Sequence, residues 1–107
     1  MKIFVIDWSV SEKTELVEIC QSLQHEIAFE LQDGAEAYRK TGELKPDLIL
    51  INYDVKPSHG KATAEAIKQR KSTANIPLYF VTEKTITDEK LSAWGKMISK
   101  KDISKIL

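Results

Sequence analysis

The stretch that decides the fold is Leu48-Ile49-Leu50-Ile51, an unbroken apolar run near the middle of the chain. A short continuous apolar run bounded by polar residues is typical of a strand that is covered on both faces. Two further runs of this kind, Ile3-Phe4-Val5-Ile6 and residues 76–81, lie on either side of it in the sequence. These three runs predict three buried central strands.

The intervals between the runs carry helical patterns and two weaker strands. We expect helices over residues 11–23, 35–42, 61–71 and 87–94, a very brief last helix around 103–107, and strands over 27–31 and 97–98. The first helix would begin at a capping box of Ser9 and Glu12, with Ser11 as a rival cap. Strands and helices thus alternate along the chain, which predicts an α/β fold with a parallel sheet and helices on both of its faces.

The length and composition of the chain fit a single domain over residues 1–107. Lys plus Arg and Asp plus Glu balance at 16 each, which argues against a general electrostatic attraction to nucleic acid. No apolar run approaches the roughly 20 residues of a membrane span, and the apolar start of the chain is too short for a signal peptide. The single cysteine, Cys20, excludes an internal disulfide and suits a buried position in a reducing compartment. We therefore expect a cytoplasmic protein that binds neither nucleic acid nor membrane.

Polar residues follow the predicted strands at the places where sites form in this class of fold. Ligands bind outside the carboxyl ends of the strands of an open parallel sheet. The residues at these ends are Asp7, Asn52, Thr82 and Lys100, so an acid, an amide, a hydroxyl and an ammonium group are expected to converge on one crevice. The loop after the first strand has no glycine and neither phosphate-binding pattern, which argues against a nucleotide site.

Over nearly its whole length, the chain resembles the CheY-like receiver domain of response regulators in two-component signalling. The pieces that carry the resemblance, in the family's order and nearly its spacing, are residues 2–7, Asp33-Gly34-Ala35-Glu36-Ala37, residues 45–51, Gly60, Asn75-Ile76-Pro77 followed by Thr82, and Lys100. The resemblance implies a flavodoxin-like, doubly wound sheet of five parallel strands in the order 2-1-3-4-5. The short interval between Thr82 and Lys100 and the short end of the chain imply shortened fourth and fifth helices.

Two positions depart from the family where its chemistry occurs. In the family, an aspartate at the end of the third strand accepts a phosphoryl group, and the resemblance places Asn52 at this position. An amide is not a nucleophile at neutral pH, whereas a carboxylate is a known covalent phosphoryl acceptor. Asp7 matches the first of the family's paired acids, but Trp8 replaces the second, and its ring is expected to fill part of the space. With one carboxylate left in this remnant acidic pocket, we expect weak Mg²⁺ binding or none, and no other cofactor.

The remaining positions concern phosphoryl contact and switching. The resemblance places Thr82 and Lys100 where the family contacts the phosphoryl group. Without that group, Lys100 is expected either to pair with Asp7 or to lie in solvent. Met97 stands where the family's switch aromatic would be, which implies that the usual switch is missing.

These departures favour a pseudo-receiver, which is a non-enzymatic protein-interaction module that works without phosphorylation. Its partner would be a sensor kinase, an output domain or another signalling protein, and a homodimer is one option. One alternative is a receiver that is phosphorylated on another acid such as Asp54, which lies past the strand end and is expected to point elsewhere. The other alternative is a small-ligand domain that holds an anion beside Lys100.

Overall fold

The computed structural model describes residues 1–9 and 14–107. The predicted capping box of Ser9 with Glu12 and the predicted helix start at Ser11 involve residues that lie outside this description. Within the described residues, no helix is both long enough and apolar enough to cross a membrane.

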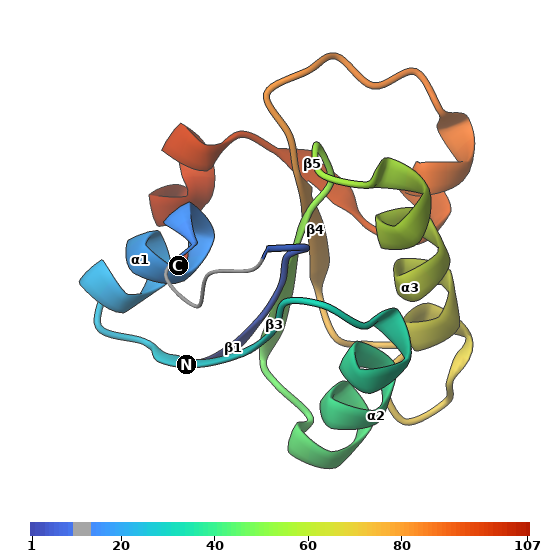
Figure 1. Ribbon diagram of the computed structural model, residues 1–107, viewed down its shortest axis with the longest axis horizontal. Coiled ribbons are helices and arrows are strands. Elements are labelled where there is room, and N and C mark those ends of the chain that lie inside the picture. The colour runs from blue at the N-terminus through green and yellow to red at the C-terminus, as the bar shows by residue number, and fades with distance from the viewer. Residues whose placement is uncertain (10–13) are drawn as a thin grey trace.

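A parallel sheet of five strands forms the centre of the molecule (Figure 1). The strands are β1 (Lys2–Ile6), β2 (Glu26–Glu30), β3 (Leu48–Asn52), β4 (Leu78–Val81) and β5 (Lys96–Ile98). In space they follow the order β2-β1-β3-β4-β5, and every pair of neighbours is parallel. The predicted fold class and strand order are therefore confirmed.

Helices cover both faces of this sheet. They are α1 (Glu15–Ser22), α2 (Gly34–Leu44), α3 (Pro57–Gln69) and the two 3₁₀ helices η1 (Glu89–Ala93) and η2 (Lys100–Lys105). Figure 1 shows α1 and the C-terminal η2 on one face, and α2, α3 and η1 on the other. The fourth and fifth helical positions hold 3₁₀ helices of 5 and 6 residues, so the prediction that these helices are shortened is confirmed.

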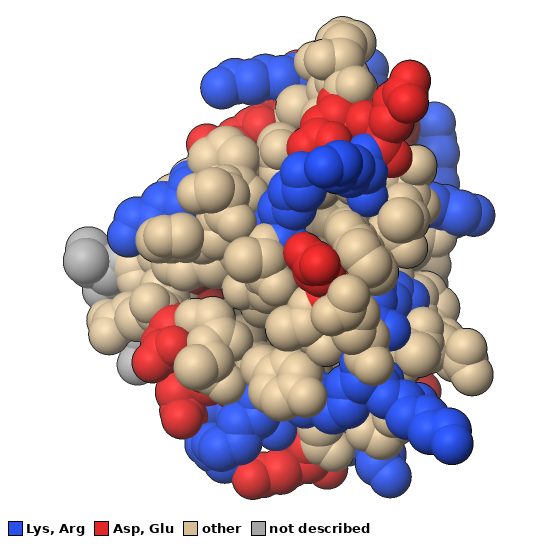
Figure 2. Space-filling model, turned by 90° about the vertical axis from the view of Figure 1, so that its right-hand side faces the viewer, with Lys and Arg blue, Asp and Glu red and all other residues tan. Residues whose placement is uncertain are grey.

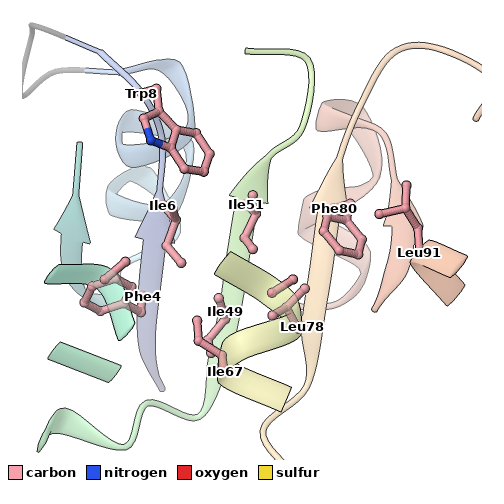
Figure 3. Close-up of a cluster of buried hydrophobic side chains, with 11 residues drawn as sticks. Phe4, Ile6, Trp8, Ile49, Ile51, Ile67, Leu78, Phe80 and Leu91 are labelled. Carbon is pink, nitrogen blue, oxygen red and sulfur yellow. The ribbon is translucent and has the colours of Figure 1, made fainter. Parts of the chain in front are cut away.

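The sheet divides the apolar core into two clusters, because successive residues of a strand point to opposite faces. The cluster on the side of α2, α3 and η1 includes Phe4, Ile6, Trp8, Ile51 and Phe80 (Figure 3). The cluster on the side of α1 and η2 includes Ile3, Val5, Leu16, Cys20 and Ile103. Cys20 is fully buried, and burial raises the pKa of its thiol to about 11, as expected for a small core residue.

The helix α2 runs past its predicted stop at Gly42 and ends at Leu44. A Cβ at Gly42 would lie 2.7 Å from Nη1 of Arg70, so this glycine permits the close approach of a guanidinium group and does not end the helix. The residue after the helix is Lys45, whose φ of 45° is left-handed and whose N–H donates to Thr41 O at 3.0 Å. Helices commonly end on a glycine in this conformation, and its absence here concealed the true end from the sequence pattern.

The helix α3 begins at Pro57 and not at Lys61 as predicted. Proline is common at the first helical position, since an N–H there would have no helical partner. Gly60, which was expected to end a loop, lies inside α3, where a Cβ would be 3.2 Å from Cγ2 of Ile51. The helix therefore packs closely against the centre of the sheet at this point.

Two further element ends depend on single hydrogen bonds. Thr14 caps α1, because its Oγ1 accepts a hydrogen bond from Val17 N at 3.2 Å. The strand β4 begins at Leu78 and not at residue 76 as predicted, because the N–H of Ile76 donates to Thr73 O in a turn at 3.2 Å. Both ends are set by polar partners that the apolar pattern does not show.

The left-handed Lys45 leads to a stability prediction. The left-handed conformation costs a residue with a Cβ about 1–2 kcal/mol of free energy. Glycine avoids this cost, but it also makes the unfolded chain more flexible, which offsets part of the gain. Lys45→Gly should therefore raise the free energy of unfolding by about 0.5–1 kcal/mol in a urea titration. Lys45→Ala is the matched control, because it removes the charge but keeps the Cβ, and it should give no such gain.

Candidate functional site

Asp7 and Asn52 lie side by side at the carboxyl edge of the sheet, where the sequence predicted the crevice. The register pairs Ile6 with Ile51, so the next residue of each chain segment stands at the same level. Asn52 Nδ2 donates a hydrogen bond to Asp7 Oδ1 at 3.1 Å. Asp7 is only 4% exposed, so the amide supplies a donor to a carboxylate that is almost out of reach of water.

Burial dominates the electrostatics of Asp7. Desolvation disfavours the ionised form and raises the pKa of this carboxyl above its usual value. Hydrogen bonds from Asn52 and Thr14 and the positive charge of Lys100 act in the opposite direction without cancelling the effect. The carboxylate is thus stabilised mainly by neutral donors.

Lys100 pairs with an acid that the sequence analysis did not consider. Its Nζ lies 2.8 Å from Oε2 of Glu15, at the start of α1, and the hydrogen bond from this pair raises the pKa of the ammonium group. Asp7 contributes only a weaker electrostatic attraction, so the expected pairing of Lys100 with Asp7 is not what the structure shows. Lys100 still lines a small cavity of about 260 Å³ together with Asp7 and Asn52.

Thr82 is held by Asp54, which turns toward the crevice and not away from it as expected. Thr82 is 6% exposed, and its Oγ1 donates to Asp54 Oδ1 at 2.5 Å. The backbone N–H of Glu83 donates to Asp54 Oδ2 at 2.9 Å. Partial burial would raise the pKa of Asp54, but these two hydrogen bonds, with the charges of Lys84 and Lys100, lower it below its usual value. The hydroxyl that the resemblance assigns to phosphoryl contact therefore already has an anionic partner.

Trp8 packs toward α3, and it also lines the small cavity beside Asp7. It lies in the core cluster with Ile51 and is 9% exposed (Figure 3). Its ring atoms Cζ3 and Cη2 would be 3.7 and 3.8 Å from a Cβ at Gly60, and its centroid is 6.0 Å from the ring of His59. What the chain loses at this position is therefore an acid, while the ring forms only one wall of the small cavity.

The donors around Asp7 do not suit a magnesium ion. Mg²⁺ prefers an octahedral set of oxygen ligands that includes one or two carboxylates and usually phosphate oxygens. Here the neighbour of Asp7 is the amide of Asn52, and Asp54 is engaged with Thr82. Among the described residues, no three acidic, histidine or cysteine side chains converge as metal ligands would. The residues present therefore do not fit a resident divalent cation.

Met97 lies away from these groups, on the edge strand β5. It pairs in register with Phe80 of β4 and is 38% exposed. Because its neighbour η1 is a short 3₁₀ helix, nothing on that side covers it fully. The side chain is thus part of the molecular surface.

A groove between α2 and α3 has a volume of about 800 Å³. Trp8 is the residue that it shares with the small cavity beside Asp7. Small side chains on its walls, among them Ala35, Ala62 and Ala66, leave it shallow and wide. Figure 2 shows this face, where uncharged surface runs between groups of acidic and basic side chains. The lining of the groove includes Asp33 and Arg70 but neither Asp7 nor Lys100 of the crevice.

Two partners in the crevice were missed by the sequence analysis. Glu15 pairs with Lys100, which lies 85 positions further along the sequence, and Asp54 accepts a hydrogen bond from Thr82, which lies 28 positions further along. Neither pair has a fixed spacing that a local pattern could show. The acidic residue in the loop after β3 was the one available signal for the second pair.

Among solved structures, the chain is similar to receiver domains of response regulators. The N-terminal domain of a response regulator receiver protein from Methanoculleus marisnigri is 25% identical with a TM-score of 0.77, over 92% of this chain and 83% of that chain. The receiver domain of sensor histidine kinase PA1611 from Pseudomonas aeruginosa, which holds a magnesium ion in its active-site cleft, is 17% identical with a TM-score of 0.79, over 98% and 92%. The chemotaxis response regulator CheY4 of Vibrio cholerae is 19% identical with a TM-score of 0.77, over 99% and 98%.

No family model and no curated protein matches the sequence. The solved structures nevertheless agree with the resemblance seen in the sequence, and that resemblance is confirmed. The chain has the fold of a response-regulator receiver domain, the class of domain that serves two-component signalling.

The buried carboxyl of Asp7 leads to a prediction on pH dependence. The pKa of Asp7 is higher in the folded state than in the unfolded chain, so the unfolded chain loses this proton at a lower pH. The free energy of unfolding therefore falls as the pH rises above the pKa that Asp7 has in the unfolded chain. Asp7→Asn removes this cost and should raise the free energy of unfolding near neutral pH, with little effect near pH 3. Urea titrations at both pH values measure the difference.

Asp47→Asn is the control for that prediction. Asp47 is an exposed acid whose Oδ2 accepts a hydrogen bond from Lys2 N at 2.8 Å, far from the crevice. Its replacement should not stabilise the protein at any pH. A loss of stability in Asp7→Asn near neutral pH would contradict our account of Asp7.

Proposed function

We propose that this chain is a pseudo-receiver, a non-enzymatic protein-interaction module of two-component signalling that works without phosphorylation. The observation that carries the proposal is the hydrogen bond from Asn52 to Asp7 at 3.1 Å. It places an amide, which cannot attack a phosphoryl group, at the end of β3, and it satisfies the neighbouring acid without a metal ion.

The surroundings of Asn52 support the same conclusion. Phosphoryl transfer depends on positioning and on the neutralisation of charge, usually by Mg²⁺. The second acid of the family's pair is replaced by Trp8, and the groups that would contact a phosphoryl group, Thr82 and Lys100, are bound to Asp54 and Glu15. The nucleophile and one metal ligand are thus absent, and the charge-stabilising groups are already engaged by other side chains.

A protein partner fits this proposal best. Two similar structures come from longer signalling proteins, the sensor histidine kinase PA1611 and a receiver-modulated diguanylate cyclase from Pelobacter carbinolicus. By analogy, we propose a sensor kinase, an output domain or another signalling protein as the partner, with a second copy of the chain as the alternative. We propose that the contact lies around the last two strands and their helices, where Met97 of β5 is one of the exposed apolar residues.

One observation favours a second candidate, a receiver that is phosphorylated on Asp54. Its carboxylate faces the crevice and contacts Thr82, so it does not point elsewhere. Both of its oxygens accept hydrogen bonds, however, and an attacking oxygen must exchange its donor for the phosphoryl group. Among the described residues, no cluster of three or more acidic, histidine or cysteine side chains includes Asp54 as a metal ligand.

Treatment with acetyl phosphate and Mg²⁺, followed by intact-mass measurement, tests the proposal. The wild type should not gain a phosphoryl group, because it lacks the nucleophile. Asn52→Asp should not gain one either, because it restores the nucleophile but position 8 is still Trp8 and not an acid. A gain in the wild type that disappears in Asp54→Asn would establish the second candidate. A gain in Asn52→Asp alone would show that the second acid is dispensable, which contradicts our reasoning on the metal.

The small-ligand alternative has its own readout in the same samples. Amide NMR spectra recorded with inorganic phosphate and without Mg²⁺ should stay unchanged around Lys100, because Glu15 already neutralises its ammonium group. Saturable shifts there would favour an anion-binding domain.

A further inference from the structure

The β4–η1 segment, residues 82–88, has no helix or strand of its own, yet polar contacts fix it in place. Near its end, Lys61 Nζ of α3 lies 2.6 Å from Asp88 Oδ2. Near its start, Glu83 Oε1 accepts a hydrogen bond from Lys100 N at 2.9 Å. The position of this segment therefore depends on side chains that reach it from other elements or reach out from it.

Asp54 holds the start of the β4–η1 segment through both carboxylate oxygens. Oδ1 accepts from the hydroxyl of Thr82 and Oδ2 from the N–H of Glu83, at 2.5 and 2.9 Å. The hydroxyl oxygen of Thr82 in turn accepts from the N–H of Lys84 at 3.1 Å. Three consecutive residues are thus arranged around one carboxylate. Asp54 precedes Thr82 by 28 positions and Glu83 by 29, so it is not a local turn cap.

The two donors form a corner that suits an oxyanion. A hydroxyl and a backbone N–H directed at one charged group make short, charge-assisted hydrogen bonds. The positive charges of Lys84 and Lys100 add to the attraction. In this chain the anion belongs to the protein itself, and a tethered group has a high effective concentration at its site.

We propose that Asp54 is an internal latch, which holds the β4–η1 segment in one conformation without any bound ligand or modification. The surface of this segment is then presented in the same conformation at all times. This inference deepens the proposed function and rests on it for its biological meaning. Its test uses no phosphodonor, so the two proposals can fail separately.

Amide hydrogen exchange of Asp54→Ala, which removes both acceptor oxygens, tests the latch. The N–H of Glu83 loses a carboxylate acceptor, and the N–H of Lys84 loses a hydroxyl that the carboxylate keeps in place. We expect the exchange of both amides to become at least about tenfold faster than in the wild type. The N–H of Tyr53, which donates to Val81 O at 2.9 Å, should keep its rate and show that the sheet is intact.

Matched variants separate the latch from a general effect of mutation. Asp47→Ala removes a carboxylate that accepts a backbone N–H elsewhere, and it should leave Glu83 and Lys84 unchanged. Thr82→Val should speed the exchange of Lys84, since it removes the hydroxyl, while Thr82→Ser keeps the hydroxyl and should preserve the wild-type rate.

Inorganic phosphate probes the vacated corner directly. In Asp54→Ala, phosphate should give saturable shifts at the amides of Glu83 and Lys84, and the wild type should give none. Two results would overturn the latch. The first is exchange within about twofold of the wild type at Glu83 and Lys84 in Asp54→Ala, together with such exchange at Lys84 in Thr82→Val. The second is an equal response of wild type and Asp54→Ala to phosphate, because an occupied corner cannot bind as well as an empty one.

Discussion

The pairing of β1 with β3 is the constraint on which the rest of the structure depends. Both strands are covered on two faces, so their register decides which side chains enter each core cluster. The same register brings Asp7 level with Asn52 at the carboxyl edge. Two carboxylates at this distance and this depth would repel each other unless a cation lay between them. The amide at Asn52 removes that repulsion and donates a hydrogen bond instead, so the centre of the sheet is stable with no metal ion.

The sheet and the positions of its polar ends could be predicted because both depend on local patterns. Unbroken apolar runs marked β1 and β3, and the polar residue after each run stands where the structure has it. The helix ends could not be predicted in the same way. Gly42 serves the packing of Arg70 and not a helix end, and this contact joins α2 to the residue that follows α3. A local pattern cannot distinguish a glycine needed for packing from a glycine needed for a turn.

The contacts of the crevice were harder to predict than its members. Asp7, Asn52, Thr82 and Lys100 all stand at the strand ends that topology requires. Their partners, however, depend on loop conformation, and the loop after β3 turns through Lys56, whose φ of 51° is left-handed. That turn separates Asp54 from the start of α3. A left-handed residue other than glycine cannot be recognised from the sequence pattern. The course of this loop, and with it the direction of the Asp54 side chain, was therefore predicted wrongly.

A switch requires an element with two arrangements of similar free energy and a ligand that favours one of them. In the receiver resemblance, the hydroxyl at Thr82 and the residue at position 97 are the parts that would change. Here Thr82 already contacts an anion, and Met97 is an exposed thioether on an edge strand. Occupation of the hydroxyl by Asp54 lowers the free energy of one arrangement whether or not a signal is present. Under our proposal, the domain keeps the receiver fold but a phosphoryl group can no longer change its conformation. Such a domain would suit a partner that is bound constantly better than one whose binding is regulated.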